Sequence, residues 1–161
     1  MNNQIQLIIK SVLDSWFSQV QRTGKLLDGL TDEQLQQQVA PHRNRGIYLL
    51  GHLVAVHDRM LPLLNLGEQM YPELDSIFLT SPDKAVAEIP SAKDLRLYWI
   101  TVNTALEKRF SVLQPEEWLE KHTAVSESDF VKEPHRNRLN VILSRTNHLS
   151  YHFGQLAFLK S

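Results

Sequence analysis

Apolar residues recur at helical spacing through most of this chain, and this period constrains the fold more than any other feature. Between Gln4 and Leu30 they follow one another at steps of three and four: Ile5, Ile8, Ile9, Val12, Trp16 and Val20. This spacing is typical of an amphipathic helix. No segment shows the clean alternation and Asn-Gly or Gly-Asn turns of β-hairpins. The sequence therefore predicts an all-α fold.

Three further segments have the same character, which makes four predicted helices of ~20 residues each, enough for a four-helix bundle. They run from about Asn44 to Leu64, with Asn44 as the N-cap, from Ser91 to Leu113, with Asp94 as the capping partner, and from Leu139 to Lys160. Thr31 opens a short acidic turn, and a helical turn is predicted from Pro115 to Glu120.

The connections 65–90 and 114–138 are long for a compact domain, and the first contains Pro72, Pro82 and Pro90. We expect it to cross over the bundle or to cover a site. With 161 residues, the chain has the length of one domain, residues 1–161.

Composition narrows the possible functions. A net charge of −1 argues against a protein that holds nucleic acid by neutralising its phosphates. No window reaches the ~18 apolar residues of a membrane span, and MNNQIQLIIK lacks the parts of a secretory signal. A cytoplasmic protein is expected. Because the chain has no cysteine, it offers no disulfide, thiolate ligand or cysteine nucleophile. Any thiol chemistry requires an external thiol.

The last predicted helix carries a polar seam where an apolar one is expected. Steps of four and three residues connect Val141, Arg145, His148, His152, Gln155 and Leu159. Polar groups are costly on a buried face unless they are paired, so a metal, a polar cleft or a ligand should lie opposite. Histidines at i and i+4, here His148 and His152, commonly supply two imidazoles to one ion. The glutamate of the zinc-peptidase motif is absent between them, so a peptidase mechanism is not implied.

A third ligand must come from another helix, and GHLVAVHDRM offers two candidates. His52 lies at the edge of that helix's apolar arc, and His57 lies nearer its centre. Periodicity alone makes His57 the more buried, as a core histidine with one hydrogen-bond partner would be. His52 is the leading candidate for the third ligand, although spacing alone favours a metal-binding role for it no more than a structural one.

The pentapeptide PHRNR occurs twice, at 41–45 and 134–138, each time before a helix that carries histidine. Basic residues oppose the dipole at a helix N-terminus. The two copies are therefore either contacts for an anionic partner or exposed, solvated loops. If the second and third helices are parallel, the second and fourth helices, which follow the two copies, are antiparallel. The copies then lie at opposite ends of the bundle and cannot form one anion site.

The segments GIYLLGHLVAVHD and NHLSYHFGQLAFL, with LTDEQL and IPSAKDLRLYW, resemble the DinB/YfiT-like superfamily of four-helix-bundle metalloenzymes. The resemblance covers essentially the whole chain, and the two histidine segments are its specific part. It implies a divalent metal on His52, His148 and His152. It also implies an up-down-down-up bundle with a long crossover between the second and third helices.

In reaction type, the resemblance implies a metal-dependent enzyme acting on a small molecule. Some relatives are transferases or isomerases that use bacillithiol, mycothiol or glutathione, and others are hydrolases. A thiol-dependent transferase with Zn, Ni or Fe is the leading hypothesis, since an imidazole-only site does not select one metal. The alternatives are a hydrolase and a non-catalytic metal-binding bundle. A di-iron bundle is disfavoured, because the chain has no Glu-x-x-His pair along a core seam.

Two further residues on the last helix are candidates for substrate contact. Arg145, about one turn before His148, either pairs with an anionic substrate group or forms a salt bridge with a carboxylate of the bundle. Tyr151 either flanks the site or fills a helix boundary. A homodimer is also expected, as in relatives, with Trp16, Trp99, Trp118 and Phe130 as aromatic surface residues away from the metal.

Overall fold

The computed structural model describes residues 2–160. These residues form helices joined by turns and loops. Four helices are long: α1 (Asn2–Asp28), α3 (Gly46–Asp58), α6 (Ala92–Phe110) and α8 (Arg138–Ala157). The shorter elements are α2 (Asp32–Leu35), α4 (Met60–Leu63), α5 (Leu74–Phe78), η1 (Pro115–Leu119), α7 (Glu127–Lys132) and η2 (Phe158–Lys160). Within these residues the only β structure is two isolated bridges, Gln38–Arg45 and Lys121–Asn137. The predicted all-α class is confirmed.

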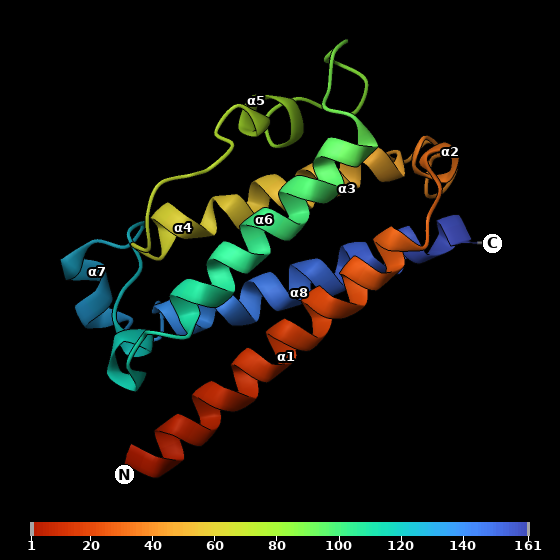
Figure 1. Ribbon diagram of the computed structural model, residues 1–161. Helices are drawn as coiled ribbons and strands as arrows, with labels where there is room; N and C mark the ends of the chain where they lie inside the picture. The colour runs from red at the N-terminus through yellow and green to blue at the C-terminus, as the bar shows by residue number, and fades with distance from the viewer. Residues whose placement is uncertain (1, 161) are drawn as a thin grey trace.

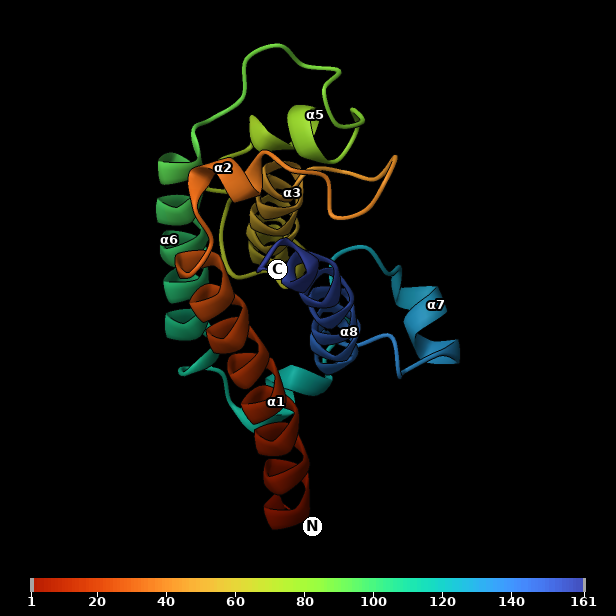
Figure 2. The same cartoon turned by 90° about the vertical axis from the view of Figure 1, so that its right-hand side faces the viewer.

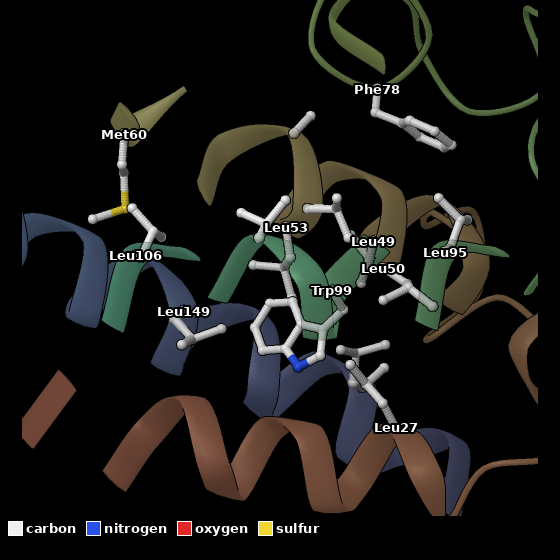
Figure 3. Close-up of a cluster of buried hydrophobic side chains, with 14 of the residues drawn as sticks. Leu27, Leu49, Leu50, Leu53, Met60, Phe78, Leu95, Trp99, Leu106 and Leu149 are labelled. Carbon is white, nitrogen blue, oxygen red and sulfur yellow. The ribbon is translucent and has the colours of Figure 1, made fainter. Parts of the chain in front are cut away.

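The long helices pack as two pairs, α1 against α8 and α3 against α6, with further contacts between the pairs (Figure 1). Turned by 90°, the molecule shows α5 and its flanking loops over the outer side of α3, and α7 on the outer side of α8 (Figure 2). The core lies between the long helices. Buried leucines of α3 (Leu49, Leu50 and Leu53) meet Leu27 of α1, Trp99 of α6 and Leu149 of α8 (Figure 3).

Most of the predicted helix starts are present in the structure. Thr31 caps α2 by accepting a hydrogen bond from the Gln34 backbone N–H, and the Gln34 side chain accepts one in return from the Thr31 N–H. Ser91 caps α6 by accepting a hydrogen bond from the Asp94 N–H. These contacts satisfy backbone donors that the first turn of a helix leaves free.

The second predicted helix is wrong in two details. It begins at Gly46, and its N-cap is Arg45 in extended backbone rather than Asn44, whose carbonyl instead accepts a hydrogen bond from the Val39 N–H. It is also interrupted at Arg59, between α3 and α4. Pro62 has no N–H to bond with the carbonyl of Asp58, four residues earlier, so the helix cannot continue unbroken there.

The 65–90 connection contains α5, which sequence periodicity missed because five residues are too few to show a period. It is bound to the start of α3 by polar contacts. The Arg45 guanidinium pairs with the Asp83 carboxylate at 2.7 Å, and the Tyr48 hydroxyl donates to the Ser81 carbonyl at 2.7 Å. The Phe78 ring lies over Gly51, where an added Cβ would come within 2.4 Å of it. The crossover is therefore fixed to the helix that carries His52.

The tryptophans belong to the core. Trp16, Trp99 and Trp118 are 1%, 5% and 1% exposed, so the expectation that they form an aromatic surface is wrong. Trp16 and Trp99 enclose His57, and Trp118 packs edge-on against Phe110. Phe130 is only partly buried. The homodimer stays a prediction without support from these three residues. Among the described residues, no helix is both long and apolar enough to cross a membrane.

The contact between Phe78 and Gly51 gives a direct test of how the crossover is held. Gly51→Ala should lower the free energy of unfolding by about 1–3 kcal/mol, because the new methyl group displaces a buried ring. Gly154→Ala in α8 is the matched control. Its added Cβ meets nothing within 4 Å, so it should stabilise the protein by up to about 1 kcal/mol through helix propensity. Urea unfolding measures the free energy of unfolding of both variants. Equal changes in the two would contradict the contact between Phe78 and Gly51.

Candidate metal centre

The polar seam of α8 faces the interior. Val141 and Leu159 at its ends are buried, and Arg145, His148, His152 and Gln155 between them are half-buried. The side of α3 that carries His52 lies opposite. Because residues three and four apart share one face of a helix, the regular spacing of the seam brings both α8 histidines to the α3–α8 boundary.

Three imidazoles converge at this boundary. The Nε2 atom of His148 lies 3.1 Å from the Nε2 of His52 and 3.1 Å from the Nε2 of His152. One nitrogen from each of the three rings lies within 4.8 Å of the others. Two nitrogens bound tetrahedrally to one ion, each at ~2.1 Å, would be about 3.4 Å apart. The cluster therefore has nearly the spacing of three ligands of one metal ion.

The outer nitrogens of two of the rings are held by oxygen acceptors. His52 Nδ1 lies 3.0 Å from the carbonyl oxygen of Phe78, at the end of α5. His152 Nδ1 lies 2.7 Å from Oε1 of Gln155. A carbonyl oxygen only accepts, so each Nδ1 donates its hydrogen and each Nε2 keeps a free lone pair. This is the usual arrangement around metal-binding histidines, in which an outer partner fixes the tautomer.

The lone pairs cannot all be satisfied within the protein. His148 can donate at most one hydrogen from its Nε2, and that hydrogen can serve only one of the two neighbouring Nε2 atoms. At least one of the two neighbouring Nε2 atoms therefore has no hydrogen to accept, although His148 Nε2 lies 3.1 Å away. A cation at the common point would use the lone pairs of all three rings, each with its hydrogen on Nδ1. The donor set fits a divalent metal ion.

All three histidines are held in the neutral form that ligates metals. Burial is the main cause of the lowered pKa of each ring. The pKa of His148 falls to about 4, because the neighbouring His152, His52 and Arg145 add to the effect of burial. Hydrogen bonds to Phe78 and Gln155 partly oppose the lowering at His52 and His152. No carboxylate is among the groups that shift these three pKa values.

His57 is separate from the cluster, as expected for a core histidine with one hydrogen-bond partner. Its side chain is 0% exposed, between the rings of Trp16 and Trp99, with centroids 4.7 and 4.9 Å away. Its Nδ1 lies 2.8 Å from Oδ1 of Asn103 on α6. Of the two candidates on this helix, the structure brings His52 to the α8 pair and packs His57 into the core.

The cluster borders a pocket of about 250 Å³. His152, Gln155 and Tyr151 line it from α8, and His42 and Arg43 line it from the loop before α3. Tyr151 is exposed, its ring contacts that of His152, and its hydroxyl accepts from the Gln155 amide at 3.3 Å. It therefore flanks the site. No carboxylate lines this pocket.

Arg145 lies on the other side of the cluster along α8. Its Nε atom is enclosed by the protein with no hydrogen-bond partner. No carboxylate of residues 2–160 forms an ion pair with its guanidinium, and burial alone lowers its pKa. The expected alternative, a salt bridge to a bundle carboxylate, is therefore not found in the described chain.

The two PHRNR segments have mainly structural contacts. Arg45 pairs with Asp83, Arg138 pairs with Glu120 at 3.3 Å, and Arg136 pairs with Glu133. Each segment forms one of the two β-bridges just before its helix. α3 begins at the end of the molecule where α8 finishes, so the segments lie at opposite ends (Figure 1). They form no common anion site, and only the first segment reaches the pocket at His152, through His42, Arg43 and Asn44.

Sequence reasoning missed three contributors to this region. The Phe78 carbonyl is a backbone atom from a distant segment and leaves no sequence signal. The role of Gln155 as the partner of His152 was available from their i, i+3 spacing. His122 lies in a loop and borders the pocket that Arg145 lines, and no periodicity marks it.

The burial of His57 predicts acid sensitivity. Its pKa is about 3 in the folded protein, against ~6.5 when unfolded. Below pH ~6.5 the unfolded chain therefore binds a proton at His57 that the folded chain does not. As the pH is lowered below ~6.5, the free energy of unfolding should therefore decrease, by up to about 1.4 kcal/mol per pH unit from this residue. Above pH ~7 His57 should contribute no pH dependence.

Urea unfolding of metal-free protein between pH 7.5 and 5 measures this dependence. His57→Phe is the comparison. It should be less stable at neutral pH, because Asn103 loses its partner, yet lose less stability per pH unit than the wild type. Identical slopes for the two proteins would show that His57 is not held neutral by the fold.

The sequence was compared with known families and proteins. A sequence model of the DinB superfamily matches residues 18–156. No curated protein matches the chain. The family match includes the helices that carry His52, His148 and His152. Since it covers most of the sequence, the chain belongs to the DinB superfamily.

Proposed function

We propose that this member of the DinB superfamily binds one divalent metal ion through His52, His148 and His152 and catalyses a thiol-dependent transfer on a small molecule. The observation that carries the metal proposal is the convergence of three Nε2 atoms, with the Nε2 of His148 3.1 Å from each of the other two and at least one lone pair without a hydrogen to accept. Zn, Ni and Fe all suit such imidazole ligands. A divalent ion on three neutral imidazoles keeps its full charge and an open position, which lowers the pKa of a thiol or water.

In this chemistry the protein's own residues orient the three histidine rings and admit a small molecule to them. The Phe78 carbonyl and Gln155 keep the His52 and His152 rings turned with their Nε2 atoms inward. The pocket at His152 gives a small molecule access from the surface, past Arg43 and Tyr151. The half-buried position of the three rings limits the water that reaches them.

A thiol fits this site better than an activated water. Hydrolysis at a metal commonly uses a nearby carboxylate as general base, as in the zinc peptidases. No Asp or Glu lines the described pocket at His152 or shifts the pKa of the three histidines. A thiol has a pKa near 8.5 and ionises beside a dication without a base. The thiol must be external, because the chain has no cysteine. Hydrolysis remains the alternative reaction.

We also propose the up-down-down-up bundle that the family resemblance implies. The chain directions support it: along α1 and α8 the colours of Figure 1 progress from left to right, and along α3 and α6 from right to left. The crossover between α3 and α6, which contains α5, allows these two helices to be parallel. This topology makes the Phe78 carbonyl available to His52.

The metal proposal predicts a clear split among the histidines. Protein loaded with Zn²⁺ and then desalted should hold about one ion per chain. His52→Ala, His148→Ala and His152→Ala should each nearly abolish occupancy. His57→Ala is the matched control: it should keep the metal while losing about 1–3 kcal/mol of stability, because Asn103 loses its partner. Elemental analysis and urea unfolding measure the two effects.

Wild-type occupancy in any of the three ligand variants would show that the site is misassigned. The transfer proposal is tested on the same loaded protein by a screen of low-molecular-weight thiols with electrophilic small molecules. Turnover should require both the thiol and His148. Turnover with water alone would favour the hydrolase.

A further inference from the structure

A second pocket lies beside the histidine cluster, on the side toward the start of α8. Its volume is about 310 Å³. Asn140, Ser144 and Arg145 line it from α8, His122 lines it from the loop before α7, and Leu63 lines it from α4. We call it the Arg145 pocket. None of the three candidate metal ligands lines it, so it is distinct from the pocket at His152.

The charge of Arg145 is not balanced by the protein. The other half-buried or buried arginines of the described chain each pair with a carboxylate: Arg45, Arg96, Arg136 and Arg138. Arg145 has no such pair in the described chain, and its Nε atom is enclosed without a partner. A charged group that is partly removed from water and left unpaired costs free energy.

His122 supports the same conclusion from a different element. Its Nδ1 atom is also enclosed without a hydrogen-bond partner. Burial lowers the pKa of His122, and the positive charges of Arg136, Lys121 and Arg145 lower it further. No carboxylate is among the groups that shift it. Two residues from separate elements, each with an unsatisfied nitrogen, therefore line the same pocket. Lys121 and Arg136 are paired with Glu127 and Glu133, so the charge without a partner is that of Arg145.

We propose that the Arg145 pocket binds the carboxylate group of a small organic acid. A guanidinium presents two parallel N–H groups that match the two oxygens of a carboxylate. The hydroxyl of Ser144 and the amide of Asn140 line the same pocket and can donate further hydrogen bonds. One guanidinium beside a neutral histidine supplies a single positive charge, which suits a monoanion.

The position of the pocket connects it to the proposed reaction. Arg145 precedes His148 by three residues on the same seam, a rise of ~4.5 Å along α8. A short molecule could therefore place its carboxylate at Arg145 and a second group at the histidines. The carboxylate belongs either to the acceptor substrate or to the thiol. This second step rests on the proposed function, whereas carboxylate binding at Arg145 does not.

Three related probes separate these statements: propionate, 2-mercaptoethanol and 3-mercaptopropionate, which carry the carboxylate, the thiol and both. Titrations use the full chain at constant ionic strength, followed by amide NMR shifts. Propionate should bind metal-free wild-type protein and shift the amides around residues 122 and 145. Arg145→Met should weaken it at least about tenfold, the loss expected for a charged hydrogen bond. Arg145→Lys keeps the charge but loses the two parallel N–H groups, so its affinity for propionate should lie between those of the wild type and Arg145→Met.

Arg43→Met is the matched control, because Arg43 lines the other pocket, at His152. It should leave propionate binding unchanged. Arg145→Met should also be at least as stable as the wild type without ligand, since no carboxylate loses a partner. Unchanged propionate affinity in Arg145→Met, or amide shifts centred on residues 42–44, would overturn the proposal. The NMR map of the wild type decides the point even if the Arg145 variants fold poorly.

Zinc-loaded protein tests the connection to the metal. If one ligand spans both places, 3-mercaptopropionate should bind at least about tenfold more tightly than either simpler probe, and Arg145→Met should abolish this advantage. If propionate binding depends on Arg145 but the thiol probes do not bind the metal, the carboxylate pocket is supported and the proposed thiol function is contradicted. If the thiols bind the metal but the affinity for propionate does not depend on Arg145, the proposed function is supported and the carboxylate pocket is contradicted.

Discussion

The α3–α8 boundary is where the two helix pairs of the fold meet through polar groups. α1 packs mainly against α8, and α3 mainly against α6, through continuous apolar surfaces. Between α3 and α8, three half-buried imidazoles face one another instead. At least one of their lone pairs has no hydrogen to accept, which disfavours the packed state unless a cation lies between the rings. The same ion that would supply the chemistry would therefore also join the two halves of the bundle.

The shape of the cluster depends on residues around it that carry no metal chemistry. The Phe78 ring rests on Gly51, and this contact brings the Phe78 carbonyl to His52 Nδ1. A side chain at position 51 would push the crossover away and free the His52 ring to turn. On α8 the corresponding role belongs to Gln155, one turn beyond His152. One ring is thus oriented by tertiary structure and the other by its own helix.

This difference explains how far the sequence could predict the site. Helical spacing alone places His148 and His152 side by side, so the sequence was enough to predict them as a pair. Periodicity placed His57 nearer the centre of the apolar arc than His52 but did not decide which of them is the third ligand, and the family resemblance was needed to choose His52. The structure shows the reason: His57 is enclosed by Trp16 and Trp99, which approach from α1 and α6. Long helices and their caps were predictable for similar reasons, because each depends on nearby residues. The short α5 and α7, the break at Arg59 and the pocket of Arg145 depend on contacts between distant segments.

X-ray absorption spectroscopy of the zinc-loaded protein tests the central claim most directly, because it reports the atoms bound to the metal. The account predicts three imidazole nitrogens at ~2.0–2.1 Å, with the remaining position filled by an oxygen ligand. Adding a low-molecular-weight thiol should replace that oxygen with sulfur at ~2.3 Å. A spectrum with fewer than three imidazoles, or one dominated by carboxylate or water oxygens, would contradict the proposed centre.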